Sequence, residues 1–341
     1  MRRITLTLPA LIAASLMLAS CAGHSHPRPQ APTTTPPSPR AEASQPVTSY
    51  WPLTGKRVLP GKTDRLRHPV LVAKIDNTVS SQPQVGLSKA DLVVEELVEG
   101  GLTRLAVFYY AHVPTNAGPI RSMRASDIDV VSPAHASIVT SGAAPQTIRR
   151  IRAAHIRYYA EPTRGMYRSP ARVAPYNLFV SLRTVAATAR RKPATPPAYL
   201  AWGSARKLPR GRKATTIGAQ FSTVHTTQWV FSHGRYHNTD SNAPAGDQFP
   251  ATTVLVLRVR EGDAGYLDPA GHHVPETLLR GSGHALLFHG GRMVAATWHK
   301  GKAPAARITL TTKAGHQLKV PAGHTWIELV PVRGGTVTYS T

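Results

Sequence analysis

The chain has 341 residues, and its 41 lysines and arginines against 17 aspartates and glutamates give a formal net charge of +24. The single cysteine, Cys21, excludes an internal disulfide and a cysteine-rich metal site. RNP and zinc-finger signatures are absent from the sequence, so no nucleic-acid partner is expected. The charge either serves solubility alone or concentrates anions around the protein.

Residues 1–20 are predicted to be a signal peptide. Two arginines precede an apolar run that is too short to span a bilayer comfortably. The run ends in Leu-Ala-Ser-Cys, which resembles the lipobox of bacterial lipoproteins, so we expect cleavage before Cys21 and lipidation of its thiol. The alternative is an ordinary signal peptide with a chance cysteine. Residues 21–49, rich in Pro, Ser, Thr and Ala, are then a disordered tether on the outer face of the cytoplasmic membrane.

Residues 50–190 are predicted to form an α/β domain with a mixed sheet. Apolar, Val-rich runs indicate strands at 69–75, 90–98, 103–110, 137–141 and 156–160. Helical spacing and prolines indicate helices at 121–131, 145–154 and 175–187. Gly100-Gly101 favours a hairpin between the second and third strands, and alternating strands and helices are typical of an α/β sheet.

A basic, proline-rich linker is predicted at 191–216, followed by a small, mostly-β domain at 217–341. The second half contains many short β runs separated by Gly-rich turns, which favours a sandwich or barrel. We expect Trp298 and Trp326 to lie in its core rather than to bind sugars. The linker is expected to be exposed and to be cleaved first by proteases, leaving two stable fragments.

Several motifs resemble the YerB-like family of bacterial lipoproteins, which carry a domain of unknown function. In the first half they are PLTG (52–55), AKIDN (73–77), GLSKADLVVEELVEGGLTR (86–104), GPIRSMR (118–124) and APYNLF (174–179). In the second half they are GSGHALLFHGGRMVAATWHK (281–300) and VPAGHTWIELVP (320–331). The resemblance implies the fold and the location outside the cytoplasm, but it says almost nothing about which activity the protein has.

The chain departs from the family's pattern at two places. Thr140 and Ala144 stand where the family's segment would place a histidine and a serine, and Tyr176 stands where relatives often carry a histidine. If those histidines act as acid or base groups in relatives, this protein lacks them. The absence of these histidines argues against the hypothesis that the protein is an enzyme.

Charged residues of both signs gather between residues 76 and 129. Under the predicted fold, Asp76 ends a strand, Arg104 follows a hairpin turn and Arg121 begins a helix, which are positions where open α/β sheets form crevices. The planar fork of arginine suits a carboxylate or phosphate. We therefore predict an anion site with the candidate residues Asp76, Asn77, Glu96, Arg104, Arg121, Ser122, Arg124 and Asn177.

Two further expectations concern neighbouring acids. Asp127 or Asp129, one helical turn beyond Arg124, is expected to hold the guanidinium of that arginine. Glu95 and Glu96 are adjacent on a strand and point to opposite faces, so only one of them can face a site. The alternative to a ligand site is that Asp76, Arg104 and Arg121 pair with one another and only stabilise the fold.

Three functions are compatible with these residues. The first is a non-catalytic lipoprotein that binds an anionic wall polymer, peptidoglycan or an envelope partner protein. The second is an enzyme acting on peptidoglycan or a wall polymer, with Asp76 or Glu96 as base and Arg104 and Arg121 stabilising negative charge. The third is a scaffold for cell-wall synthesis proteins. No cofactor and no metal are expected, because the histidines show no metal-binding spacing.

Overall fold

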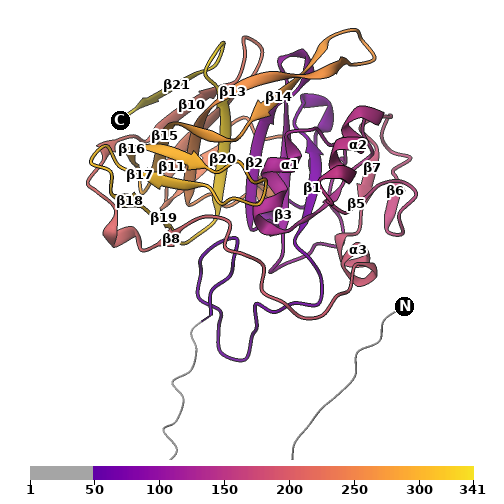
Figure 1. Ribbon diagram of the computed structural model, residues 1–341, viewed down its shortest axis with the longest axis horizontal. Coiled ribbons are helices and arrows are strands. Elements are labelled where there is room, and N and C mark those ends of the chain that lie inside the picture. Colours follow the sequence, from indigo (N-terminus) through magenta and orange to yellow (C-terminus); the bar gives the residue numbers. More distant parts are fainter. Residues whose placement is uncertain (1–48) are drawn as a thin grey trace, which may run out of the picture. The chain divides into compact units, whose positions relative to one another are not determined.

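One sheet of 13 strands runs through the described part of the chain, residues 49–341, of this computed structural model. In sheet order the strands are β18 (Gln317–Leu318), β17 (Thr309–Thr311), β16 (Arg292–Lys300), β15 (Gly281–His289), β13 (Thr253–Leu267), β20 (Thr325–Pro331), β2 (Leu92–Leu97), β3 (Thr103–Tyr109), β1 (Leu71–Asp76), β4 (Ser137–Val139) and β5 (Tyr158–Tyr159) (Figure 1). Off this path, β14 (His273–Leu278) pairs with β13 and β9 (Arg212–Lys213) with β16. The predicted signal peptide, Cys21 and all of the tether but Ser49 lie outside the described residues.

Smaller elements complete the fold. A four-stranded sheet has the order β12 (Arg235–Asn238), β11 (Thr226–Ser232), β10 (Thr216–Gln220) and β21 (Thr336–Ser340). Two strand pairs are β8 (Trp202–Gly203) with β19 (Val320–Pro321) and β6 (Met166–Arg168) with β7 (Leu178–Val180). The α-helices are α1 (Asp127–Val131), α2 (Pro145–Ala153) and α3 (Leu182–Thr188). Short 3-10 turns are η1 (Val79–Ser81), η2 (Leu87–Lys89), η3 (Glu99–Gly101), η4 (Ser132–Ala134), η5 (Ala205–Lys207) and η6 (Ala245–Asp247).

The structure is mostly sheet with few helices, in agreement with the predicted α/β and mostly-β halves. The predicted hairpin is confirmed, because β2 and β3 pair antiparallel around the η3 turn. In that turn Gly100 and Gly101 both have positive φ, at 70° and 71°, which glycine adopts without steric cost. None of the helices in residues 49–341 is long and apolar enough to cross a membrane.

Two predicted helices are shorter than expected. Only Asp127–Val131 of the segment 121–131 is helical, because the backbone before it bonds to neighbouring segments: Arg121 N–H donates to the Lys74 carbonyl and Met123 N–H to that of Gly142. In the segment 175–187, the apolar run Leu178–Val180 pairs with β6 as a strand instead. The helix α3 then begins behind Ser181, whose side chain accepts the N–H of Thr184.

The two halves of the chain share the large sheet. Strand β20, from the C-terminal half, lies between β2 and β13 and pairs with both in parallel. All seven residues of β20 and all six of β2 are buried, so the junction lies inside the molecule. The predicted linker is packed along part of its length, since Tyr199 and Leu200 are buried and β8 and β9 belong to sheets.

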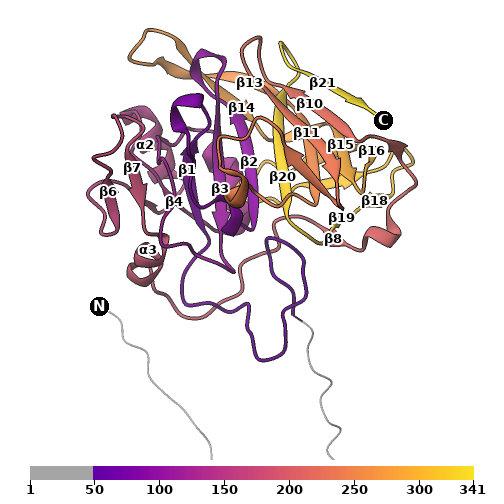
Figure 2. The same ribbon diagram turned by 180° about the vertical axis from the view of Figure 1, so that it is seen from behind.

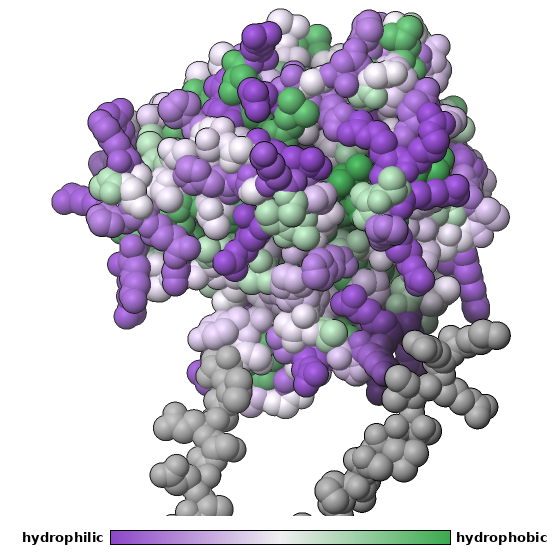
Figure 3. All heavy atoms as spheres, viewed as in Figure 1, coloured by the Kyte–Doolittle hydropathy of each residue, from purple (hydrophilic) through white to green (hydrophobic). Residues whose placement is uncertain are grey.

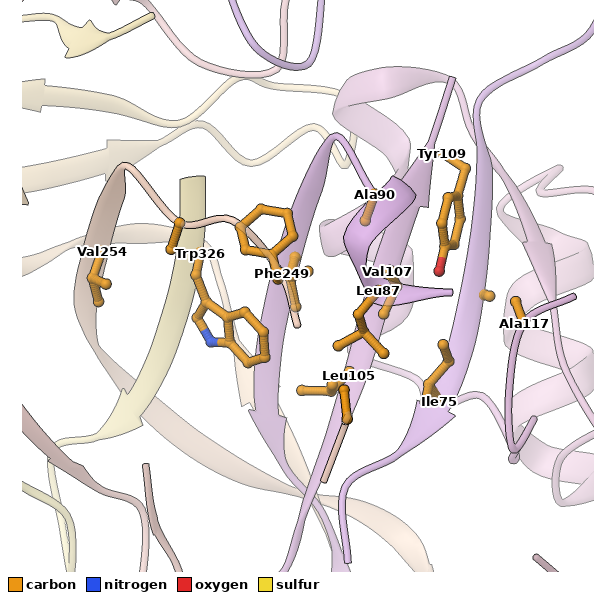
Figure 4. Close-up of a cluster of buried hydrophobic side chains, with 14 of the residues drawn as sticks. Ile75, Leu87, Ala90, Leu105, Val107, Tyr109, Ala117, Phe249, Val254 and Trp326 are labelled. Carbon is orange, nitrogen blue, oxygen red and sulfur yellow. The ribbon is translucent and has the colours of Figure 1, made fainter. Parts of the chain in front are cut away.

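Hydrophobic clusters cover both faces of the large sheet. One includes Leu105, Ile217, Trp229 and Trp326, so the four-stranded sheet packs on this face, which is presented in Figure 2. The indoles of Trp229 and Trp326 meet edge to face with centroids 5.1 Å apart. Figure 4 shows Trp326 beside Phe249 within this cluster. The other cluster lies against α1 and α2 and includes Trp298, so both tryptophans lie in the core as predicted.

Candidate anion-binding pocket

A pocket of about 500 Å³ lies where the N-terminal half of the sheet meets the β13–β14 hairpin. Arg104 enters it from the start of β3, and Arg121, Ser122 and Arg124 enter from the loop between β3 and α1. The remaining lining residues are Glu99, Ala144, Pro145, Tyr266, Leu267, Asp268, Pro269 and Val274. An arginine of β3 and two arginines of the loop before α1 therefore converge on one hollow.

Sheet register explains the position of Arg104. The antiparallel pairing places it opposite Asp76 of β1 and opposite Glu96 of β2. Its Nη1 donates to the Ser122 carbonyl at 3.0 Å, and its Nη2 lies 3.7 Å from a carboxylate oxygen of Glu99. The arginine thus joins the sheet to the loop that carries the other two.

The other two arginines are held by separate carboxylates. Glu99 accepts from Nε of Arg124 at 2.9 Å and also from its Nη2, a bidentate arrangement. Arg121 Nε lies 3.3 Å from the buried carboxylate of Asp76, and its guanidinium stacks over the Tyr176 ring at 5.1 Å from the centroid. Glu99 lies in the η3 turn, and from there its carboxylate reaches Arg124 in the loop before α1.

The three arginines crowd one another in the pocket, which has two lining carboxylates, Glu99 and Asp268. Burial and then repulsion by Arg124 lower the pKa of Arg104 to about 10. The Nε of Arg104 and the Nη1 of Arg121 are buried and have no hydrogen-bond partner among the described residues. Buried N–H groups are normally paired, so these two are exceptions within the described residues. Asp268 also lines the pocket and brings a second carboxylate to its rim.

Four of the eight predicted site residues line the pocket: Arg104, Arg121, Ser122 and Arg124. Asp76 lies directly behind it, where its carboxylate accepts from the N–H and hydroxyl of Thr78 and pairs with Arg121. The other three lie elsewhere. Asn77 donates to Glu95 and Thr103, and Asn177 accepts from Arg168.

Glu96 belongs to a fully buried ion cluster rather than to the pocket. Lys74 donates to Glu96 at 2.6 Å and to Asp127 at 2.7 Å, and all three side chains are inaccessible to solvent. Burial raises the pKa of Asp127 to about 6, with Lys74 opposing and Glu96 adding to the shift. Burial alone would raise the pKa of Glu96, but the Lys74 ammonium holds it below the ordinary value. A base role for Glu96 is therefore not supported by its position.

The predicted partners of Arg124 were wrong. Asp127 accepts the backbone N–H of Arg124 at 2.7 Å rather than its guanidinium. Asp129 instead pairs with Arg280 at 2.7 Å and with Lys300 at 3.3 Å. The helix begins only at Asp127, so Arg124 lies outside it. The i,i+3 contact that a helix would provide is therefore not formed.

The opposite orientations of Glu95 and Glu96 are confirmed. Glu95 faces the four-stranded sheet, where it accepts from Thr103 at 2.7 Å and Thr227 at 2.9 Å and contacts His225 Nε2 at 2.8 Å. Its neighbour across the parallel pairing is Glu328, whose pKa is raised by burial and by Glu95. This second buried network joins the halves of the chain. No group of three or more metal-ligand side chains in residues 49–341 is arranged to hold a metal.

Family models match both halves of the chain. The N-terminal domain of DUF3048, a protein family of unknown function, matches residues 53–195, and its C-terminal domain matches residues 217–327. The chain belongs to the DUF3048 family. The unmatched interval between the two models falls within the predicted linker.

A similar DUF3048 relative comes from Bacillus subtilis. The "Putative lipoprotein YerB" of strain 168 is 24% identical over 303 residues, covering 82% of this chain and 86% of the relative. The crystal structure of YerB from Bacillus subtilis aligns with a TM-score of 0.69 and 19% identity, covering 85% of this chain and 99% of that one. The likeness establishes the shared fold.

Thr140, Ala144 and Tyr176, where the sequence was expected to differ from the YerB-like pattern, each contact or line the arginine loop or its pocket. The buried Thr140 hydroxyl accepts the N–H of Met123 and donates to the Arg121 carbonyl, both at 3.0 Å, so it holds the arginine loop. Ala144 lines the pocket, and Tyr176 stacks on Arg121. No histidine lines the pocket in the described residues.

Proposed function

We propose that this protein is a lipid-anchored envelope protein that binds an anionic cell-wall component in the arginine pocket without catalysing a reaction. The observation that carries the proposal is the convergence of Arg104, Arg121 and Arg124 on one hollow. A phosphate or carboxylate oxygen is the acceptor that the planar fork of an arginine binds best. Wall polymers supply phosphate and peptidoglycan supplies carboxylate.

The state of the carboxylates favours binding over catalysis. A general base works best with a pKa near the working pH. Glu99 is held bidentately by Arg124, and although burial opposes the shift, that contact lowers its pKa below the ordinary value. Asp76 is buried and engaged by Thr78 and Arg121. Positions 140, 144 and 176 hold threonine, alanine and tyrosine, so none of them brings a histidine to the pocket.

The binding proposal is tested by cosedimentation of a soluble fragment with isolated cell wall. Residues 47–341 form one compact unit that contains both hydrophobic clusters, so we expect this fragment to fold without the preceding residues. Arg121→Gln should weaken binding about tenfold or more, because it removes a charged donor from the pocket. Arg149→Gln, which removes an exposed arginine of α2, is the control. Equal binding by both variants would contradict the pocket as the binding site.

The anchor is proposed from the Leu-Ala-Ser-Cys sequence, and the name of the Bacillus subtilis relative supports it. Cys21→Ala should remove the acceptor thiol, so the protein should appear in the medium or remain an uncleaved precursor. Membrane fractionation with an antibody to the folded part measures this. A fully processed Cys21→Ala protein that still fractionates with the membrane would refute lipidation at this residue.

A further inference from the structure

A rigid turn near the start of the described chain exposes a large apolar side chain. Residues Leu59-Pro60-Gly61-Lys62 form the turn, in which Lys62 N–H donates to the Leu59 carbonyl at 3.0 Å. Proline in the second position and Gly61 with φ of 75° in the third are the signature of a type II turn. Leu59 is 68% exposed. Because the turn fixes the backbone, little order is lost if this side chain enters an apolar phase.

The residues just before the turn line a hollow of about 710 Å³ with a cationic rim. Lys56, Arg57, Arg307 and Lys319 line it, while no aspartate or glutamate does. Each of these four cations is exposed, and none forms an ion pair with a described residue. An adjoining hollow of about 700 Å³ shares Lys319 and adds two further lysines and again no acid. Uncompensated positive charge therefore extends over both hollows.

The same region receives the N-terminal end of the described chain. Val58 N–H donates to the Ser49 carbonyl at 2.9 Å, and Tyr50 forms an isolated bridge with Arg57. Tyr50 also lines the first hollow and is 55% exposed. In Figure 1 the loops before β1 project from the lower end of the molecule. Figure 3 shows hydrophilic side chains projecting along the lower and left margins of this view.

We propose that this region docks onto the anionic phospholipid head groups of a membrane. Its members, called the N-terminal basic surface, are Tyr50, Lys56, Arg57, Leu59, Lys62 and Lys319. Lysines and arginines are attracted to anionic lipid, and tyrosine and leucine at a loop tip suit the boundary between head groups and acyl chains. A soluble polyanion accounts for the cations but leaves the exposed Leu59 unused.

The surface lies at the end of the described chain that would be joined to the proposed lipid anchor. The proposal that it docks on the cell's own membrane rests on that anchor. The residues from Cys21 to Ser49 span at most about 100 Å when fully extended. An anchored protein therefore keeps this end within that distance of the bilayer, and the tether raises the local concentration of head groups. Docking would turn the arginine pocket, whose hairpin lies at the upper end of Figure 1, away from the membrane.

Vesicle binding by the fragment 47–341 tests the proposal. The fragment lacks Cys21, so the measurement does not depend on whether Cys21 is lipidated. It also does not depend on whether the arginine pocket binds an anion. We expect binding to vesicles of phosphatidylcholine with phosphatidylglycerol, weakening with salt, and little binding to phosphatidylcholine alone. Arg57→Gln with Lys62→Gln and Lys319→Gln should weaken binding on the order of a hundredfold, since each charge contributes about fivefold.

Matched controls separate a specific surface from general basicity. Gln at Arg149, Arg152 and Arg157 removes three exposed arginines around α2 and β5 and should change vesicle binding by about threefold or less. Leu59→Ser should weaken binding about tenfold, whereas Val224→Ser, at a residue that is 65% exposed, should not. A circular dichroism melt of each variant verifies its fold. Equal losses in the two triple variants, or binding of soluble polyphosphate without binding of anionic vesicles, would overturn the proposal.

Discussion

Replacing Lys74 by methionine is expected to lower the free energy of unfolding of the fragment 47–341 by about 3–5 kcal/mol near neutral pH. Lys74 is the cation of the cluster that also contains Glu96 and Asp127, all fully buried. Removing it leaves two carboxylates in the interior without their counter-charge. Urea denaturation measures the loss, and Lys89→Met, at an exposed position, should change stability by only about 0.5 kcal/mol.

The pH dependence identifies the cause of that loss. Burial raises the folded-state pKa of Asp127 to about 6, above that of an unfolded aspartate. Between these two pKa values the folded state binds more protons than the unfolded state, so this group makes stability fall as pH rises. Without Lys74 the pKa rises further, so the fall should steepen and extend above about pH 6. A loss in Lys74→Met that is equal at about pH 5 and pH 8 would contradict the stranded-charge account.

Separating the two halves of the chain is expected to abolish cooperative folding of the first half. A fragment 49–195 loses β20, and with it the parallel partner of β2 along Leu92–Glu96. The edge exposed in this way is a fully buried strand in the whole protein, and such edges lead to aggregation. Trp326, which fills the junction in Figure 4, is lost at the same time.

The measurement is the thermal unfolding of 49–195 compared with that of 47–341. We expect aggregation, or a broad transition without native near-ultraviolet dichroism. Proteolysis between 190 and 213 should then yield a nicked protein whose pieces stay together, rather than the two stable fragments that the sequence suggested. A sharp, reversible transition in isolated 49–195 would show that the family's N-terminal domain folds independently.

Local signals predicted the strands well and the ion cluster poorly. The apolar run at 69–75, which contains Lys74, indicates a buried strand, and the glycines at 100 and 101 mark the turn that follows β2. Nothing local indicates that Lys74 meets Glu96 and Asp127, which are 22 and 53 residues away. That contact depends on the register of β1, β3 and β2, which sets Lys74 against Glu96, and on the position of α1, which carries Asp127. Its residues become neighbours only when three segments are assembled.

The arginines of the pocket were predictable because each follows a turn signal. Glu99 lies in the glycine turn, so the same turn signal could have predicted that it holds Arg124. The wall formed by Tyr266 and Asp268 was not, because it comes from a hairpin more than a hundred residues later. The helix expected at 121–131 covers only Asp127–Val131, because the first residues of the segment bond to Lys74 and Gly142 instead of to one another.

Anion binding in the arginine pocket is tested most directly by the thermal midpoint of the fragment 47–341, measured with and without inorganic pyrophosphate. A ligand that binds only the folded state stabilises it by about 2.7 kcal/mol at a hundred times its Kd. We predict a rise of several degrees for the wild type and for Arg149→Gln, and almost none for Arg121→Gln. Equal rises in all three proteins would show that pyrophosphate binds outside the arginine pocket and would contradict the proposed function.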